Sequence, residues 1–172
     1  MPITTPRRLS EAILSALAAA GSADVTAGGE HPAGAHMAGA HMAGEHSAGF
    51  EAAIARLDAL DHALVSLLLA GMIRRLLELR HPDGFDGSDV QQVLTEAVRA
   101  SQWYRDSDPR LLAAALMGAL TVLEPGERVT RPSAAHAILL IAALLPDQPT
   151  GAAALIEAEL AELRRAETIE LP

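Results

Sequence analysis

The stretch that decides the fold is residues 50–80, FEAAIARLDALDHALVSLLLAGMIRRLLELR. Large apolar side chains recur in it every three or four residues, the spacing that places them on one face of an α-helix. In the middle of the stretch, further apolar residues widen that face most of the way around: Val65, Leu69, Ile73 and Leu77. The pattern predicts one long helix that is surrounded by other helices or by another subunit.

Further helical segments lie on both sides of this stretch, and most are bounded by a capping residue, a proline or a glycine. The expected segments are residues 9–20, 88–103, 109–123, 133–145 and 151–167. Residues 109–123 and 133–145 are apolar on nearly every face, whereas the other three are amphipathic. We therefore predict an all-α fold, a single-domain antiparallel helical bundle of about five to six helices.

Residues 30–49 consist of consecutive five-residue units, EHPAG, AHMAG, AHMAG and EHSAG. On a helix, a five-residue period turns successive histidines by about 140°, and on a strand it alternates their face. Glycine in every unit, together with Pro32, disfavours a helix. We predict a disordered His/Gly/Ala-rich insert between an N-terminal unit (residues 1–29) and a bundle core (residues 50–167), with a short tail at residues 168–172.

The histidines of this repeat are candidate metal ligands: His31, His36, His41 and His46. A flexible tract could fold around Zn²⁺, Ni²⁺ or copper, and Met37 and Met42 beside two of the histidines suit Cu(I). A metal-binding protein is therefore one alternative function. The competing interpretation is a tandem duplication that lengthened an exposed linker, where insertions cost little. A third interpretation is that these imidazoles respond to pH by gaining protons as the pH falls.

Composition restricts the partners of this chain. Its formal net charge is −9 and all 13 of its basic residues are arginines, which argues against nucleic acid as a partner. The chain has no cysteine, which excludes disulfides and thiol chemistry. The longest apolar runs fall well short of the roughly 20 residues of a membrane span, so we expect no transmembrane helix.

The location in the cell has two interpretations. The absence of cysteine fits a reducing cytoplasm, where we expect the protein. The alternative is export, because residues 1–23 combine Arg7 and Arg8 with a short apolar run and a small-residue stretch, as a signal peptide does. Against export, the apolar residues of this segment fall at helical spacing, which favours a retained amphipathic helix.

Two of the four aromatic residues are adjacent in one short segment, Trp103-Tyr104-Arg105, near a predicted helix end. These residue types are common at the centre of protein interfaces, although they can equally cover the end of a core. No Ser-His-Asp order, phosphate-binding glycine loop or Glu-x-x-His pair is present, so we lean against an enzyme.

The leading hypothesis for the function is a non-enzymatic helical interaction or regulatory module that binds a protein partner or itself. Self-association through the apolar helices, giving a homo-oligomer, is the expected form of it. Besides the metal-binding alternative, a second alternative is a small-molecule-binding domain or enzyme with a pocket between apolar helices. His62 and His136 would be the polar groups of that pocket.

Overall fold

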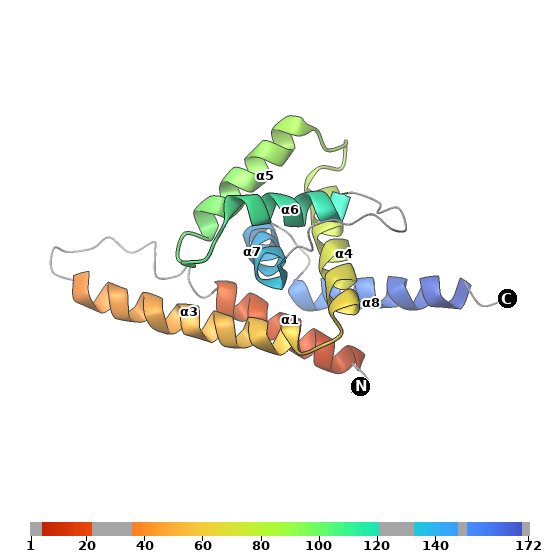
Figure 1. The fold of residues 1–172 in the computed structure, drawn as a ribbon. Coiled ribbons are helices and arrows are strands. Elements are labelled where there is room, and N and C mark those ends of the chain that lie inside the picture. Colours follow the sequence, from red (N-terminus) through yellow and green to blue (C-terminus); the bar gives the residue numbers. More distant parts are fainter. Residues whose placement is uncertain (1–4, 22–35, 121–132, 148–150, 170–172) are drawn as a thin grey trace.

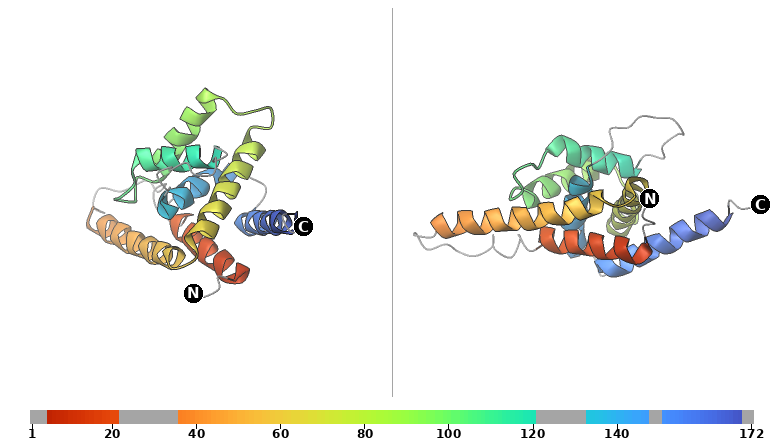
Figure 2. Two further views of the ribbon diagram at one scale, coloured as in Figure 1. Left: turned by 45° about the vertical axis from the view of Figure 1, so that its right-hand side comes forward. Right: turned by 60° about the horizontal axis from the view of Figure 1, so that its bottom comes forward.

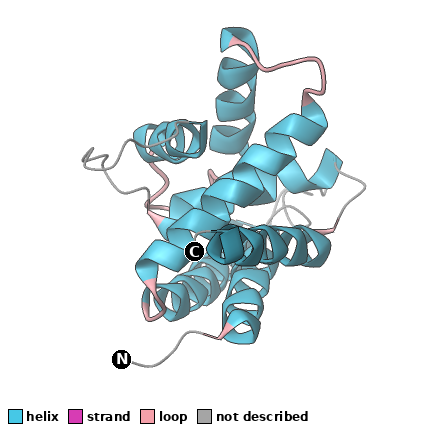
Figure 3. Cartoon of the chain, turned by 90° about the vertical axis from the view of Figure 1, so that its right-hand side faces the viewer, coloured by secondary structure: helices cyan, strands magenta, loops and turns pink. Residues whose placement is uncertain are grey.

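The computed structural model describes residues 5–21, 36–120, 133–147 and 151–169 (Figure 1). Within these ranges the chain forms seven α-helices and one 3₁₀ turn, with no strand (Figure 3). The elements are α1 (Pro6–Gly21), α3 (His36–Asp58), α4 (His62–Arg80), α5 (Gly87–Ala100), α6 (Pro109–Leu120), α7 (Ala134–Leu144), η1 (Leu145–Asp147) and α8 (Ala152–Ile169). The predicted all-α fold class is confirmed, although the described ranges hold more helices than the sequence indicated.

Helix α7 is the centre of the molecule. Every residue from Ala134 to Ile141 is buried, and α7 packs against α1, α3, α4, α5 and α6. In Figure 1 it is seen close to end-on, with α6 above it and α1 and α3 below. A helix without a polar face is stable only when all its sides are covered, and here the chain's own helices cover it.

The predicted antiparallel bundle is only partly present. Helices α1 and α3 lie side by side and run in opposite directions, as the views in Figures 1 and 2 agree. Helix α4 instead crosses this pair, and α7 runs across it as well. The helices are therefore stacked crosswise around one central helix, because α7 is apolar on all sides and accepts neighbours from every direction.

The prediction of one long helix over residues 50–80 is wrong, because the stretch is divided between two helices. Helix α3 ends at Asp58 and α4 begins at His62. The carboxylate of Asp61 accepts the backbone N–H groups of Ala63 and Leu64 at 3.0 and 3.2 Å, which caps the new helix. The apolar spacing continues across the break, so periodicity alone does not reveal it.

Removing this cap should weaken the second helix specifically. We expect Asp61→Ala to lower the free energy of unfolding by about 1 kcal/mol, since two N–H groups of the first turn lose their acceptor. Asp61→Asn keeps a side-chain oxygen and should cost less. Urea denaturation followed by circular dichroism measures both variants, and an equal loss for both would contradict a capping role.

The repeat is helical from His36 onward, which corrects the expected disordered insert for that part of it. Residues 30–35 lie outside the described residues. Alanine, methionine and glutamate are strong helix formers, and they offset the roughly 1 kcal/mol that each glycine costs in a helix. Helix α3 packs on α1, and Phe50 and Leu57 in the C-terminal part of α3 are fully buried. This packing stabilises the helix from its C-terminal end.

Two helix starts test the capping signals. Helix α6 begins at Pro109 as predicted, and Asp108 Oδ1 accepts the N–H of Arg110 at 2.8 Å. Helix α5 begins at Gly87, one residue before the predicted start. Its capping box is formed by Asp86 and Asp89, each carboxylate accepting the other's backbone N–H.

Helix α8 rests on α1 and α4, and its far half extends beyond the other helices (Figures 1 and 2). Gly71 of α4 faces Glu159 of α8, and a Cβ at this position would require the Glu159 carboxylate to shift. Burial raises the pKa of Glu159, against the opposing effect of Arg75, whose guanidinium lies 3.7 Å away. The contact therefore joins α4 and α8 through one half-buried carboxylate.

Candidate functional site

Four rings meet where α3 passes the connection between α5 and α6, and we call them the aromatic cluster: His46, Phe50, Trp103 and Tyr104. The Trp103 ring lies edge-on to His46 and Phe50, with centroids 4.8 and 5.3 Å apart. Tyr104 lies edge-on to Phe50 at 5.1 Å. Edge-to-face contacts at these distances are the favoured arrangement of aromatic pairs.

The cluster has a buried base and a partly exposed top. Phe50 is completely buried, whereas Trp103 and Tyr104 are each half-buried and pack against the core. Arg105, the next residue along the chain, is exposed. Both large rings are thus held rigidly and still reach solvent.

The connection that carries the two rings, residues 101–108, is closed by its own hydrogen bonds. The N–H of Tyr104 donates to the carbonyl of Ser101, and the N–H of Ser107 donates to that of Tyr104, both at 3.0 Å. The hydroxyl groups of Ser101 and Ser107 lie 2.8 Å apart, with Ser101 buried. Consecutive turns of this kind present Trp103 and Tyr104 in one fixed orientation.

His136 of α7 anchors the same connection to the core. Its Nε2 accepts the backbone N–H of Asp108 at 3.1 Å, and the residue is 4% exposed. Burial lowers the pKa of His136, against the backbone of Asp106 and the carboxylates of Asp108 and Asp106, which favour the charged form. The ring is therefore neutral at pH 7, as an accepting Nε2 requires.

Carboxylates from two elements act on the cluster. Burial raises the pKa of Tyr104, and the negative charges of Asp106 and Glu51 raise it further. Glu51 belongs to α3 and Asp106 to the connection, and both are exposed. The exposed rim of the cluster therefore carries the negative charges of Glu51 and Asp106, with Arg105 next to Tyr104 along the chain.

The predicted interaction residues Trp103 and Tyr104 come together with two residues that the sequence analysis did not connect to them. The sequence signal for His46 and Phe50 was their spacing of four residues, which brings two side chains together on a helix. The predicted disordered insert covers residues 30–49, and in a disordered segment this spacing indicates no contact. The contact with Trp103, more than fifty positions away, had no sequence signal.

The predicted metal ligands are not assembled in the part of the chain whose side chains the structure describes. There, no three His, Asp or Glu side chains lie close enough to hold a metal ion. His46 packs against Trp103, and His31 lies outside the described residues. His36 and His41 are on α3, but the structure does not describe their side chains. The metal site therefore stays a prediction from sequence.

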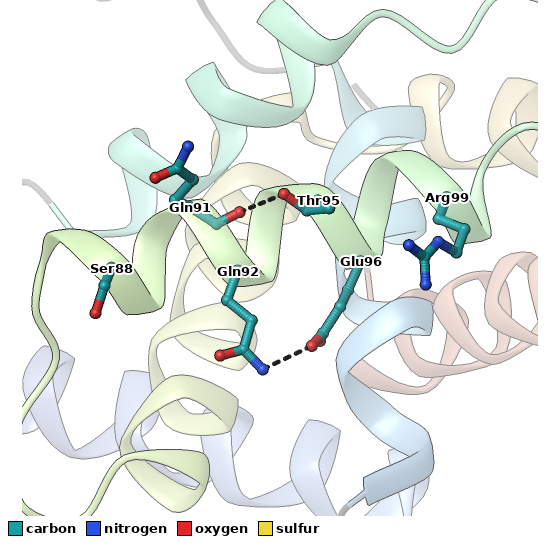
Figure 4. Close-up of a pocket in the computed structure, with 6 residues that line it drawn as sticks. All are labelled: Ser88, Gln91, Gln92, Thr95, Glu96 and Arg99. Atoms are coloured by element: carbon teal, nitrogen blue, oxygen red, sulfur yellow. Dashed lines mark hydrogen bonds between the residues drawn. The ribbon is translucent and has the colours of Figure 1, made fainter.

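Two hollows on the described surface bear on the small-molecule alternative. The first, of about 370 Å³, is lined only by residues of the polar face of α5 (Figure 4), and Arg80 and Gln92 already bind its Glu96. The second, of about 300 Å³, is an apolar depression between α1, α7, η1 and α8. Neither hollow is lined by His62, which is exposed, or by His136.

Comparisons of this chain with protein-family models, with curated proteins and with solved structures find no match. In the described ranges, no helix has both the length and the apolar character needed to cross a membrane. The function must therefore be argued from the residues and their arrangement.

Proposed function

We propose that this protein is a non-enzymatic helical interaction module that binds a protein partner through the aromatic cluster. The observation that carries the proposal is that Trp103 and Tyr104 are only half-buried although they rest on the fully buried Phe50. Tryptophan and tyrosine are enriched at the energetic centres of interfaces, where rigid rings bury a large area at low entropic cost. A pre-ordered pair of this kind suits a partner surface.

The proposal is tested by immobilising the full chain and identifying the proteins that it retains from an extract of its source cells. We expect a partner that binds the wild type and is lost with Trp103→Ala, which removes the ring. It should also be lost with Asp106→Arg, which leaves the ring packing intact and reverses an exposed charge beside it.

Matched variants make this experiment specific. Asp83→Arg reverses an exposed charge on the turn before α5, and Leu67→Ala truncates an exposed apolar residue of α4. Both should retain the partner, and thermal melting verifies that all four variants are folded. Without a protein that shows this pattern of loss and retention, the aromatic cluster is not an interaction surface.

Self-association is the second candidate function, and one observation favours it. Leu67 of α4 and Met117 of α6 are 56% and 52% exposed, more than the other exposed large apolar side chains of the described ranges, Leu14 and Leu79. Since α7 is enclosed within the chain, a second copy would contact these outer faces rather than the most apolar helix. Sedimentation velocity of the wild type and of Leu67→Ser tests this, because only the wild type should form dimers.

A cytoplasmic location also belongs to the proposal. Its support is that Leu9, Ile13 and Leu17 of α1 are buried in the same core as α7. Removal of residues 1–23 as a signal peptide would take these side chains out of the core.

A further inference from the structure

The aromatic cluster has an electrostatic character that selects among partners. Trp103 and Tyr104 are both partly exposed, and the faces of aromatic rings are negatively polarised. The exposed carboxylates of Glu51 and Asp106 flank them from α3 and from the connection. Arg105 balances one of these charges, so the rim keeps a net negative charge.

We infer that the aromatic cluster receives a cationic segment of a protein partner, an extended or helical stretch bearing arginine or lysine side chains. This inference rests on the proposed interaction function and specifies its partner. A guanidinium or ammonium group over the face of Trp103 is attracted by the ring quadrupole. The exposed carboxylates of Glu51 and Asp106 attract the same cation electrostatically.

Charge complementarity also decides against two other occupants. A second copy of this chain carries a net charge of −9, so two copies that met rim to rim would bring like charges together. A nucleic acid would bring phosphates against Glu51 and Asp106, at a cost rather than a gain. A basic protein segment is the partner class that both the rings and the carboxylates favour.

The geometry of the carboxylates strengthens this inference. Ser47 Oγ donates to Glu51 Oε1 at 3.2 Å, four residues away on the same helix, which restrains that side chain. Asp106 is two residues beyond Tyr104, in the hydrogen-bonded connection. The backbone positions of both residues are thus fixed, and the hydrogen bond to Ser47 lowers the ordering entropy that Glu51 would lose on binding.

The test uses Trp103, the only tryptophan of the chain, as a fluorescent probe. The full chain is titrated with three peptides of equal length and equal Gly/Ser content, in which the variable positions are Arg, Gln or Glu. We expect a saturable change of Trp103 emission with the Arg peptide, weakening as salt is added, and no saturation with the Gln or Glu peptides.

Two double variants locate the binding. Glu51→Gln with Asp106→Asn should weaken the Arg peptide about fivefold, since each rim pair contributes modestly in water. Glu78→Gln with Glu157→Gln removes the same amount of charge from exposed positions on α4 and α8, and it should leave the affinity nearly unchanged. All four substituted side chains are exposed, so folding should be retained.

The other outcomes overturn the inference in distinct ways. Equal weakening by both double variants would mean attraction to the whole acidic chain, without a site. Equal binding of the Gln peptide would mean an apolar surface with no preference for cations, and concentration-dependent emission without peptide would mean a second copy. If no peptide binds but the extract yields a partner lost with Trp103→Ala, the interaction function stands and the cationic partner is rejected. If both fail, both are rejected.

Discussion

Replacing Leu140 by alanine is expected to lower the free energy of unfolding by about 2–5 kcal/mol. Leu140 is completely buried in the middle of α7, and α7 contacts most of the other helices, so the cavity cannot be closed by the movement of one neighbour. Because a domain of this size is stable by only about 5–15 kcal/mol, this single truncation removes a large part of the total. Urea denaturation monitored by circular dichroism gives the difference.

The matched control is the same substitution at an exposed leucine. Leu67→Ala, at a position 56% exposed, should change the unfolding free energy by less than about 0.5 kcal/mol. If Leu140→Ala does not fold, Ile138→Val at another fully buried position of α7 should still cost about 0.5–1.5 kcal/mol. Equal losses at Leu140 and Leu67 would contradict the enclosed position of α7 and would show that the outer face of α4 is buried in an oligomer.

Acidification below about pH 6.5 is expected to destabilise the wild-type protein through His136. Its pKa is lowered in the folded state, so the unfolded chain binds the extra proton first as the pH falls. Stability is therefore lost between the unfolded pKa near 6.5 and the lower folded pKa, by at most about 1.4 kcal/mol per pH unit for one group. Once protonated, Nε2 can no longer accept the N–H of Asp108.

The measurement compares urea denaturation of the wild type and His136→Gln between pH 5 and 8. Glutamine can still accept the Asp108 N–H but does not titrate, so this part of the pH dependence should disappear in the variant. Glu159, whose raised pKa works in the opposite direction, is present in both proteins and cancels in the difference. His62→Gln at an exposed position is the matched control, and an equal effect there would exclude His136 as the source.

The same hydrogen bond links stability to the proposed interaction. The connection that carries Trp103 and Tyr104 is attached to α7 by the contact between Asp108 and His136. A change at a core helix can therefore reach the exposed rings through one side chain. As the pH is lowered until His136 becomes protonated, His136→Gln should retain the partner in the extract experiment better than the wild type does.

The helical content could be read from the sequence because it follows from local rules. Alanine and leucine favour a helix wherever they stand, and Asp108 before Pro109 marks the start of α6 independently of its neighbours. The break at Asp61 was missed because the apolar residues before and after it continue at helical spacing. The helical part of the repeat was missed because counting glycines ignores the support that α3 receives from α1 at its far end.

Only part of the candidate site could be predicted from the sequence. Trp103 and Tyr104 stood out as rare aromatics near a helix end, and they are indeed partly exposed. Their neighbours His46 and Phe50, and the anchoring His136, lie far away along the chain. No spacing rule connects residues so distant, because only the crossing of α3 with the connection brings them together.

By itself the sequence determined that this chain is all-helical, acidic, without cysteine, and bounded in its helices by prolines and acidic caps. These properties depend on interactions between residues at most four positions apart, or on composition alone. Only the tertiary structure decided that α7 is the single central helix, that α3 and α4 separate at Asp61, and that four rings meet at the surface. Those outcomes depend on which apolar faces cover one another, and two nearly uniform apolar helices carry no local signal that ranks one as more central than the other.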